Sequence, residues 1–274
     1  MISKCVFPCA GFGTRFLPVT KTIPKEMLPI SSRPLIEYSI NEAFESDVTD
    51  MVIILNKYKL SLKDYFVENI ALNELIRNSA KESRLFLQRK LSKMCNFDFI
   101  EQEDMLGLGH AIFQAKGIMG NSSFAVILPD DLCYAANDNV LQQMINIHND
   151  FPDKCILALE RVDDENLSKY GVIDGVRLQE NPRLFHVSDL IEKPQNEDAP
   201  SNFAIIGRYI FTNDIFDAIE DTVPDENGEI QITNALKRLA KIGKVIGYEF
   251  EGKRLDCGTN SGYLDANIFF KDKF

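Results

Sequence analysis

Short apolar runs alternate with amphipathic segments along the first 160 residues. The runs at 5–9, 51–55 and 124–128 contain no charged side chain, as is typical of strands that helices cover on both faces of a parallel sheet. Ile36, Ile40 and Phe44 recur at four-residue spacing after an Arg-Pro pair, which predicts a helix over 33–44. We expect further strands at 97–101 and 154–159, and helices at 61–66, 72–93, 108–117 and 139–149. This order predicts an α/β fold with a doubly wound, mostly parallel, Rossmann-like sheet.

From Tyr170 the pattern changes to short alternating segments separated by turns, which predicts an antiparallel lobe at one edge of a mixed sheet. Its strands are expected at 171–174, 185–192 and 204–211. Helices follow at 214–220 and 230–241, a strand at 244–250 and a last helix at 261–271. We predict a single domain over 1–274, with an α/β core (1–160), a part with the antiparallel lobe (161–258) and a C-terminal helix (259–274).

The composition is that of a soluble globular protein, with 45% hydrophobic and 26% charged residues. The net charge of -11 argues against a nucleic-acid or anionic-membrane partner. The six cysteines form no CxxC pair, so we expect buried free thiols in a reducing compartment. The chain runs into a strand without a signal peptide, and its apolar runs are too short to span a membrane. These features predict a cytoplasmic protein.

A glycine-rich loop follows the first strand, with the sequence Ala-Gly-Phe-Gly-Thr at 10–14. Its backbone N–H groups and the nearby cations Arg15 and Lys25 suit a phosphate chain. A dinucleotide fingerprint is not met, because Phe16 stands at the third glycine position and Pro18 and Pro24 prevent an early helix. The alternative is a plain β-turn beside an exposed arginine.

Several acidic and polar residues stand where a ligand could reach them. Asp130 and Asp131 end a buried strand, where ligands of open α/β sheets bind, and one of them could hold Mg²⁺ together with substrate phosphates. The alternative is an Asx-turn or a helix cap. Asp256 could supply a second carboxylate. A further candidate is the pair Glu192 and Lys193 before Pro194, which could instead be a solvated surface ion pair. The polar groups at Gln102 and 107–111 could contact a base, or they could form a helix cap. His110 opens a helix, which favours a structural role over that of a general base.

These strings together resemble the signature of sugar-1-phosphate nucleotidylyltransferases. The resemblance rests on Ala-Gly-Phe-Gly-Thr-Arg at 10–15 and Pro-Lys-Glu-Met-Leu-Pro at 24–29. It continues with Leu-Pro-Asp-Asp (128–131), Tyr-Gly-Val (170–172), Glu-Lys-Pro (192–194), Gly-Arg-Tyr (207–209), Glu-Ile-Gln-Ile-Thr (229–233) and Asp-Cys-Gly (256–258). The Lys-Glu-Met-Leu-Pro segment resembles that of the uridylyltransferase branch of this family. It differs from the Lys-Gln-Leu-Leu-Pro-like segment that thymidylyltransferases carry at the same place.

The resemblance implies that UTP and glucose 1-phosphate react, with Mg²⁺, to give UDP-glucose and pyrophosphate. It implies that 1–160 binds the nucleotide and that 161–258 binds the sugar. The implied nucleotide contacts are Ala10, Gly11 and Gly13 through the backbone, Glu26 fixing the loop, and Gln102 with Gly107 at the uracil edge. The implied catalytic groups are Arg15 at the β,γ-phosphates, Lys25 at the α-phosphate and Lys193 at the sugar phosphate.

The same resemblance implies that Gly171, Glu192 and Gly207 line the sugar pocket, and that Asp131 and Asp256 hold the metal. A homodimer or homotetramer is expected. The chain departs from the family pattern at Glu101, where arginine is frequent, and at Gly228 and Asn234, where acids are usual. Two alternatives stay open: a thymidylyltransferase that uses dTTP, and a regulatory subunit that binds nucleotide sugars without catalysis.

Overall fold

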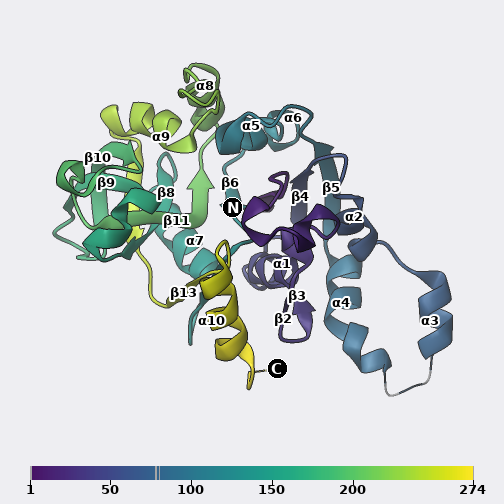
Figure 1. Ribbon diagram of the computed structural model, residues 1–274. Helices are drawn as coiled ribbons and strands as arrows, with labels where there is room; N and C mark the ends of the chain where they lie inside the picture. Colours follow the sequence, from purple (N-terminus) through teal and green to yellow (C-terminus); the bar gives the residue numbers. More distant parts are fainter. Residues whose placement is uncertain (1, 78, 80, 274) are drawn as a thin grey trace.

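A mixed nine-stranded sheet is the centre of the computed structural model, which describes residues 2–77, 79 and 81–273 (Figure 1). From one edge to the other, the strands are β5 (Asn96–Glu101), β4 (Asp50–Leu55), β1 (Lys4–Pro8), β6 (Phe124–Ile127), β11 (Phe203–Phe211), β8 (Cys155–Arg161), β12 (Val245–Glu249), β10 (Leu184–Glu192) and β9 (Gly171–Arg177). Strands β5, β4, β1 and β6 are parallel to one another, as are β8 and β12. The prediction of an α/β fold with a mostly parallel first half is confirmed.

Strand β11 lies in the middle of the sheet, antiparallel to both β6 and β8. The prediction that 204–211 belongs to an edge lobe is therefore wrong, whereas β9 and β10 do pair antiparallel at the edge. All nine residues of β11 are buried. Its sequence Phe-Ala-Ile-Ile-Gly-Arg-Tyr-Ile-Phe is nearly continuous in apolar residues, which is typical of a strand covered on both faces.

Helices cover both faces of the sheet, as the doubly wound pattern predicts. One apolar cluster joins the sheet to α5 (Gly107–Phe113), α6 (Lys116–Met119), α8 (Asp214–Glu220) and α9 (Ile232–Lys241). The other joins it to α1 (Leu35–Glu45), α2 (Leu60–Phe66), α4 (Phe86–Met94) and α7 (Val140–Asp150). Strand β1 sends Val6 to the first cluster and Cys5 and Phe7 to the second, since successive side chains of a strand point to opposite faces.

The single helix predicted over 72–93 is interrupted in the structure. Helix α3 (Ile70–Ile76) ends where Arg77 adopts an extended conformation (φ -53°, ψ 133°), and α4 begins at Phe86. Residues 78 and 80 of the predicted helix lie outside the described residues. In Figure 1, α3 lies away from the sheet at the side of the molecule.

Two short ladders and the last helix form a third packing unit. Strand β7 (Asp131–Tyr134) pairs antiparallel with β13 (Lys253–Asp256), and β2 (Pro29–Ile30) pairs with β3 (Arg33–Pro34). Helix α10 (Asn260–Phe270) packs on them through a small apolar cluster. The short 3-10 helices are Thr14–Phe16, Val19–Lys21, Lys25–Met27, Glu82–Leu85, Asp164–Lys169 and Asn196–Asp198. The pattern of apolar residues did not predict β7 and β13, although they carry two of the predicted site residues.

A buried ion pair connects the central strand β11 to helix α1. The Arg208 side chain is fully buried, its Nη2 lies 2.7 Å from Oε2 of Glu42, and its Nε donates to Oε1 at 3.0 Å. Burying two charges costs free energy unless they are paired. The same guanidinium donates to the carbonyl oxygen of Gly207 at 3.0 Å, so it also anchors the backbone beside the candidate site.

We expect Arg208→Ala to lower the free energy of unfolding by about 3–5 kcal/mol, because it leaves Glu42 charged, buried and unpaired. Urea unfolding followed by circular dichroism measures this. The matched control is Arg238→Ala. The ion pair between Arg238 and Asp221 is exposed, so its loss should change the free energy of unfolding very little. Equal losses in the two variants would contradict the interpretation.

Candidate functional site

The glycine-rich loop leaves β1 and is held against the end of β4. The backbone N–H of Cys9 donates to the carbonyl oxygen of Ile54 at 2.7 Å, and the Asn56 amide donates to the carbonyl oxygen of Ala10. Gly13 has a positive φ of 65°, a conformation that glycine adopts without strain. The structure therefore fixes the backbone of the predicted nucleotide loop at the carboxyl end of the parallel strands, where ligands of open α/β sheets bind.

Under this loop, Glu26 forms a buried ion pair with Lys59. The Nζ of Lys59 lies 2.7 Å from Oε2 and 2.9 Å from Oε1 of Glu26, and also donates to the carbonyl oxygen of Cys9 at 2.6 Å. Glu26 is fully buried and Lys59 nearly so. The sequence does not indicate that Lys59 belongs to the site, because a lysine in a polar segment after a strand is usually exposed. This pair ties the segment around Glu26 to the start of the glycine loop.

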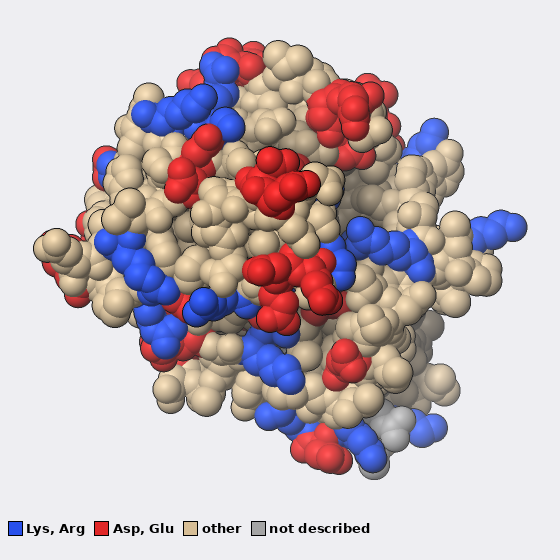
Figure 2. All heavy atoms as spheres, turned by 60° about the vertical axis from the view of Figure 1, so that its left-hand side comes forward, with Lys and Arg blue, Asp and Glu red and all other residues tan. Residues whose placement is uncertain are grey.

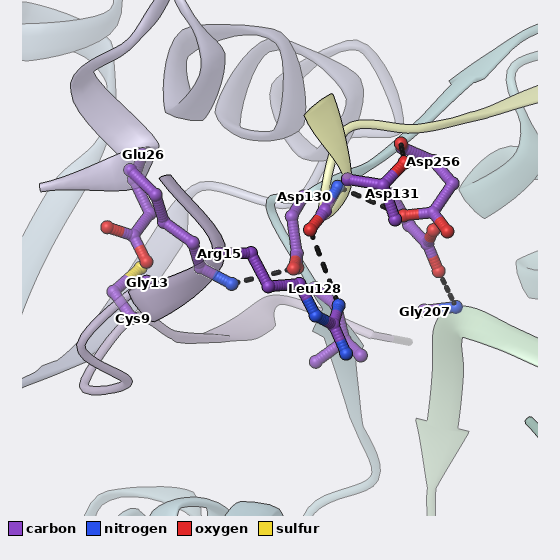
Figure 3. Close-up of polar contacts among 12 residues, drawn as sticks. Cys9, Gly13, Arg15, Glu26, Leu128, Asp130, Asp131, Gly207 and Asp256 are labelled. Carbon is purple, nitrogen blue, oxygen red and sulfur yellow. Dashed lines mark hydrogen bonds and ion pairs between the residues drawn. The ribbon is translucent and has the colours of Figure 1, made fainter. Parts of the chain in front are cut away.

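The two predicted cations lie on the loop side of the site. Nζ of Lys25 is 2.6 Å from Oδ2 of Asp130, and Nη1 of Arg15 donates to the carbonyl oxygen of Gly258 at 3.3 Å (Figure 3). Burial alone would lower the pKa of Lys25, but Asp130 and Glu26 outweigh it and raise this pKa. Burial alone would raise the pKa of Asp130, but the ion pair with Lys25 outweighs it and lowers this pKa. Both groups are therefore charged at neutral pH.

Asp131 and Asp256 face each other as direct partners across the β7–β13 ladder. Oδ2 of Asp131 accepts from the backbone N–H of Gly207 at 2.8 Å, and its Oδ1 accepts from Nε of Arg254 at 2.7 Å. Oδ2 of Asp256 lies 3.7 Å from Nη2 of Arg254 and accepts from the Tyr170 hydroxyl at 3.2 Å. Burial raises the pKa of Asp131, and Arg254 opposes this effect without cancelling it.

The adjacent acids point to different sides. In Figure 3, Asp130 points toward the amino-terminal loop and Asp131 toward Gly207. The side chain of Asp130 is 26% exposed and that of Asp131 is 11% exposed. A Cβ built on Gly258 would lie 3.1 Å from Oδ2 of Asp130 and 3.0 Å from Oδ1 of Asp256. Asp130 and Asp256 therefore face the same small space. Both oxygens of Asp131 accept hydrogen bonds, and so do both oxygens of Asp256, whose Oδ1 accepts from the backbone N–H of Gly258 at 2.9 Å.

A cavity of about 580 Å³ brings most of the predicted catalytic, sugar and metal residues together. The predicted residues that line it are Arg15, Asp131, Gly171, Glu192, Lys193, Gly207 and Asp256. Arg254, Tyr170 and Thr233 also line it and had not been singled out as site residues. Thr233 donates its hydroxyl to Oε2 of Glu192 at 2.6 Å, which fixes the orientation of that carboxylate.

Two glycines of this cavity are places of close approach. A Cβ on Gly171 would lie 2.9 Å from the hydroxyl of Thr233, and a Cβ on Gly207 would lie 2.8 Å from Oδ2 of Asp131. Lys193 follows Glu192 with a positive φ of 45°, and its Nζ lies 3.3 Å from Oε1 of that residue. The Lys193 side chain is 55% exposed, so its ammonium group is accessible to an anion.

A second cavity of about 290 Å³ lies on the other side of the glycine loop and contains Gln102. Its lining residues are Phe12, Asn56, Lys57, Tyr58, Glu101, Gln102, Glu103 and Met105. The amide of Gln102 is 3.4 Å from the carbonyl oxygen of Gly107, which connects these two predicted residues. Phe12 lines this cavity and Arg15 lines the larger one. The glycine loop therefore runs from one cavity to the other.

The surface and the helices add two observations. Basic and acidic side chains are interspersed on the face of the molecule that Figure 2 shows. No helix within residues 2–77, 79 and 81–273 combines the length and apolar character needed to cross a lipid bilayer.

Comparison with known proteins identifies the family. The model of the family described as nucleotidyl transferase matches residues 8–273. The chain belongs to the nucleotidyl transferase family. A UTP–glucose-1-phosphate uridylyltransferase of Pseudomonas aeruginosa is 48% identical over 271 residues, which cover 98% of this chain and 96% of that protein. The corresponding enzyme of Bacillus subtilis is 38% identical over 269 residues, covering 98% and 91%.

Solved structures agree with the assignment of this chain to the nucleotidyl transferase family. The crystal structure of an apo UDP-glucose pyrophosphorylase has a TM-score of 0.95 and 46% identity, covering 100% of both chains. A UDP-glucose pyrophosphorylase in complex with UDP-glucose has a TM-score of 0.92 and the same identity and coverage. The α/β fold of this chain is therefore that of the nucleotidyl transferases.

We expect Arg254→Ala in this nucleotidyl transferase to lower the free energy of unfolding by about 3–5 kcal/mol at pH 8, because Asp131 loses its buried counter-ion. The loss of Arg254 raises the folded-state pKa of Asp131 further above its unfolded value of 3.8. A raised carboxyl pKa destabilises the folded state as pH rises through the interval between the two values. The deficit should therefore be larger at pH 8 than near pH 4, where the part that comes from Asp131 is lost.

Urea unfolding at both pH values measures this pH dependence. Arg238→Ala is the control: its ion pair with Asp221 is exposed, so this variant should show little deficit at either pH. A deficit of Arg254→Ala that does not change with pH would show that Asp131 is not the group left unpaired.

Proposed function

We propose that this nucleotidyl transferase transfers a uridylyl group from UTP to glucose 1-phosphate and releases pyrophosphate. The observation that carries the proposal is the course of the glycine loop. It leads from the smaller cavity at Gln102 to the cations Arg15 and Lys25, and then to the larger cavity with Glu192 and Lys193. Relatives with this activity in their names match nearly the whole chain at 46–48% identity.

The chemistry needs few side chains that move protons. An oxygen of the sugar phosphate attacks the α-phosphorus of UTP, a new P–O bond forms, and the bond to the β-phosphate oxygen breaks. The electron pair of that bond leaves with pyrophosphate. The nucleophile is already anionic at pH 7, so positioning and charge neutralisation carry the reaction. In this proposal Arg15 holds the β,γ-phosphates and Lys25 neutralises the α-phosphate.

The sugar substrate would bind in the larger cavity. Lys193 has an accessible ammonium group for the phosphate of glucose 1-phosphate. Glu192, oriented by Thr233, would accept hydrogen bonds from sugar hydroxyls, and Gly171 and Gly207 would line the pocket for the ring. The uracil would meet Gln102 and Gly107, while the backbone of Ala10, Gly11 and Gly13 would follow the nucleotide.

The carboxylates of the site fit Mg²⁺, which proteins commonly hold through one or two carboxylates together with substrate phosphates. Within the described residues, no three His, Cys, Asp or Glu side chains are grouped so that they could hold a metal on their own, so phosphate oxygens would complete the shell. Bound there, Mg²⁺ would withdraw charge from the phosphates. The family resemblance implies Asp131 and Asp256 as ligands, whereas the space that Asp130 and Asp256 share beside Gly258 favours Asp130 as the partner of Asp256.

Three further predictions go with this function. The nucleotide part would comprise 1–160 and the sugar part 161–258, with 259–274 as the C-terminal helix. A homodimer or homotetramer stays a prediction that sedimentation velocity can check. A cytoplasmic location also stays a prediction.

We expect pyrophosphate release with UTP and glucose 1-phosphate, and a much lower rate with dTTP in place of UTP. A coupled pyrophosphate assay with purified protein and Mg²⁺ measures both. A preference for dTTP would support the thymidylyltransferase alternative. Binding of UDP-glucose without turnover of any nucleotide would support the regulatory-subunit alternative.

We expect Asp130→Asn and Asp256→Asn to raise the Mg²⁺ concentration for half-maximal rate by about tenfold or more, because each removes a charged oxygen ligand. Activity titrations with MgCl₂ at saturating UTP measure this shift. Asp131→Asn is the comparison: it should lower thermal stability and shift the Mg²⁺ requirement less. A larger Mg²⁺ shift in Asp131→Asn than in Asp130→Asn would instead assign the ligand to Asp131.

A further inference from the structure

His110 lies on α5, with a glutamine amide at each of its two ring nitrogens. Its Nδ1 is 2.9 Å from Nε2 of Gln102, and its Nε2 is 3.0 Å from Nε2 of Gln114. Gln102 is only 2% exposed and lines the smaller cavity, whereas Gln114 is half-buried. The histidine therefore contacts the amide group of Gln102, the residue that is expected to bind the base.

The chemistry of the imidazole ring restricts these contacts. A neutral histidine has one ring N–H and one bare nitrogen, so it cannot accept from both amides. One glutamine must present its oxygen to the ring instead, and O and N of an amide are assigned from the hydrogen-bond network. The state of His110 thus determines which end of Gln102 faces the cavity.

The surroundings of Gln102 select one of the two arrangements. Its Nε2 also lies 3.4 Å from the carbonyl oxygen of Gly107, which can only accept. Turning this buried amide would place two acceptors against each other. Gln114 can turn at lower cost because it is half-buried and can bond to water, although it gives up a 3.3 Å contact with the carbonyl oxygen of His110. Nδ1 of His110 is then the acceptor.

We propose that His110 is a specificity-determining positioning residue that holds the Gln102 amide with Oε1 toward the nucleotide base. This inference rests on the proposed function. An oxygen in that position accepts from the N3–H of uracil. Cytosine has a bare N3, so the two lone pairs would oppose each other, and a buried acceptor without a donor is costly.

The test compares kcat/KM for UTP, CTP and dTTP at fixed glucose 1-phosphate in wild type and in His110→Leu. Sites that hydrogen-bond a substrate N–H reject analogues strongly, so the UTP:CTP ratio should fall by about tenfold or more in His110→Leu. The loss should lie mainly in KM for UTP. The UTP:dTTP ratio should not change, because uracil and thymine both carry N3–H.

Two substitutions separate this role from a purely structural one. His110→Gln should restore most of the UTP:CTP ratio, because its amide oxygen can accept the same hydrogen from Gln102. Gln114→Lys presents only donors to Nε2 of the ring, so the ring hydrogen should move to Nδ1, which can then no longer accept from Gln102. This substitution, which lies outside the cavity, should therefore lower the UTP:CTP ratio. Gln114→Leu, which leaves Nδ1 free to accept, is its control and should keep the wild-type ratio.

An unchanged UTP:CTP ratio in His110→Leu, with only a lower melting temperature, would overturn the inference. If that variant does not fold, an unchanged ratio in Gln114→Lys overturns it. Absence of UTP turnover in the wild type is a different result, because it rejects the proposed function itself.

Discussion

Two carboxylates lie directly opposite each other across the β7–β13 ladder, and a single guanidinium makes this arrangement stable. Like charges at facing positions of a sheet repel, and Arg254 lies between them, over the ring of Tyr170 at 4.6 Å. Asp131 in turn holds the backbone of Gly207 on β11. The larger cavity, the central strand β11 and the last strand β13 all meet at this group of charges.

The other half of the site depends on a second buried charge pair. Lys59 and Glu26 lie under the glycine loop, and together they connect the end of β1, the start of α2 and the segment that carries Lys25. A charge pair of this kind contributes more to a unique loop conformation than to net stability. The cations above it, Arg15 and Lys25, are then presented from a backbone that is already fixed, which is what a polyphosphate site requires.

The sequence predicted the parts of the fold that depend on local pattern. The strands β1, β4 and β6 are visible because their apolar runs reflect cover on both faces. Strands β7 and β13 were not visible, because four residues with charged members carry no periodic signal. The place of β11 depends on pairing with strands far away in the sequence, which local pattern does not contain.

The candidate site shows the same division. Gly171, Glu192, Lys193 and Gly207 could be named from motifs, and they do line one cavity. Lys59 and Arg254 could not, because burial and a tertiary partner distinguish them from ordinary surface cations. The choice between Asp130 and Asp131 depends on where β7 begins, since consecutive residues there point to opposite sides.

The position of β11 has a consequence for how the chain folds during synthesis. Strands β6 and β8 are separated in the sheet by a strand that leaves the ribosome more than forty residues after β8 ends. Until then, both would expose an unpaired edge, which promotes association between chains. The two parts of the molecule are thus joined through a shared sheet, and a fragment that ends before β11 lacks the strand that completes it. The sheet that contains the parallel strands of residues 1–160 is therefore complete only after residues 203–211 have been made.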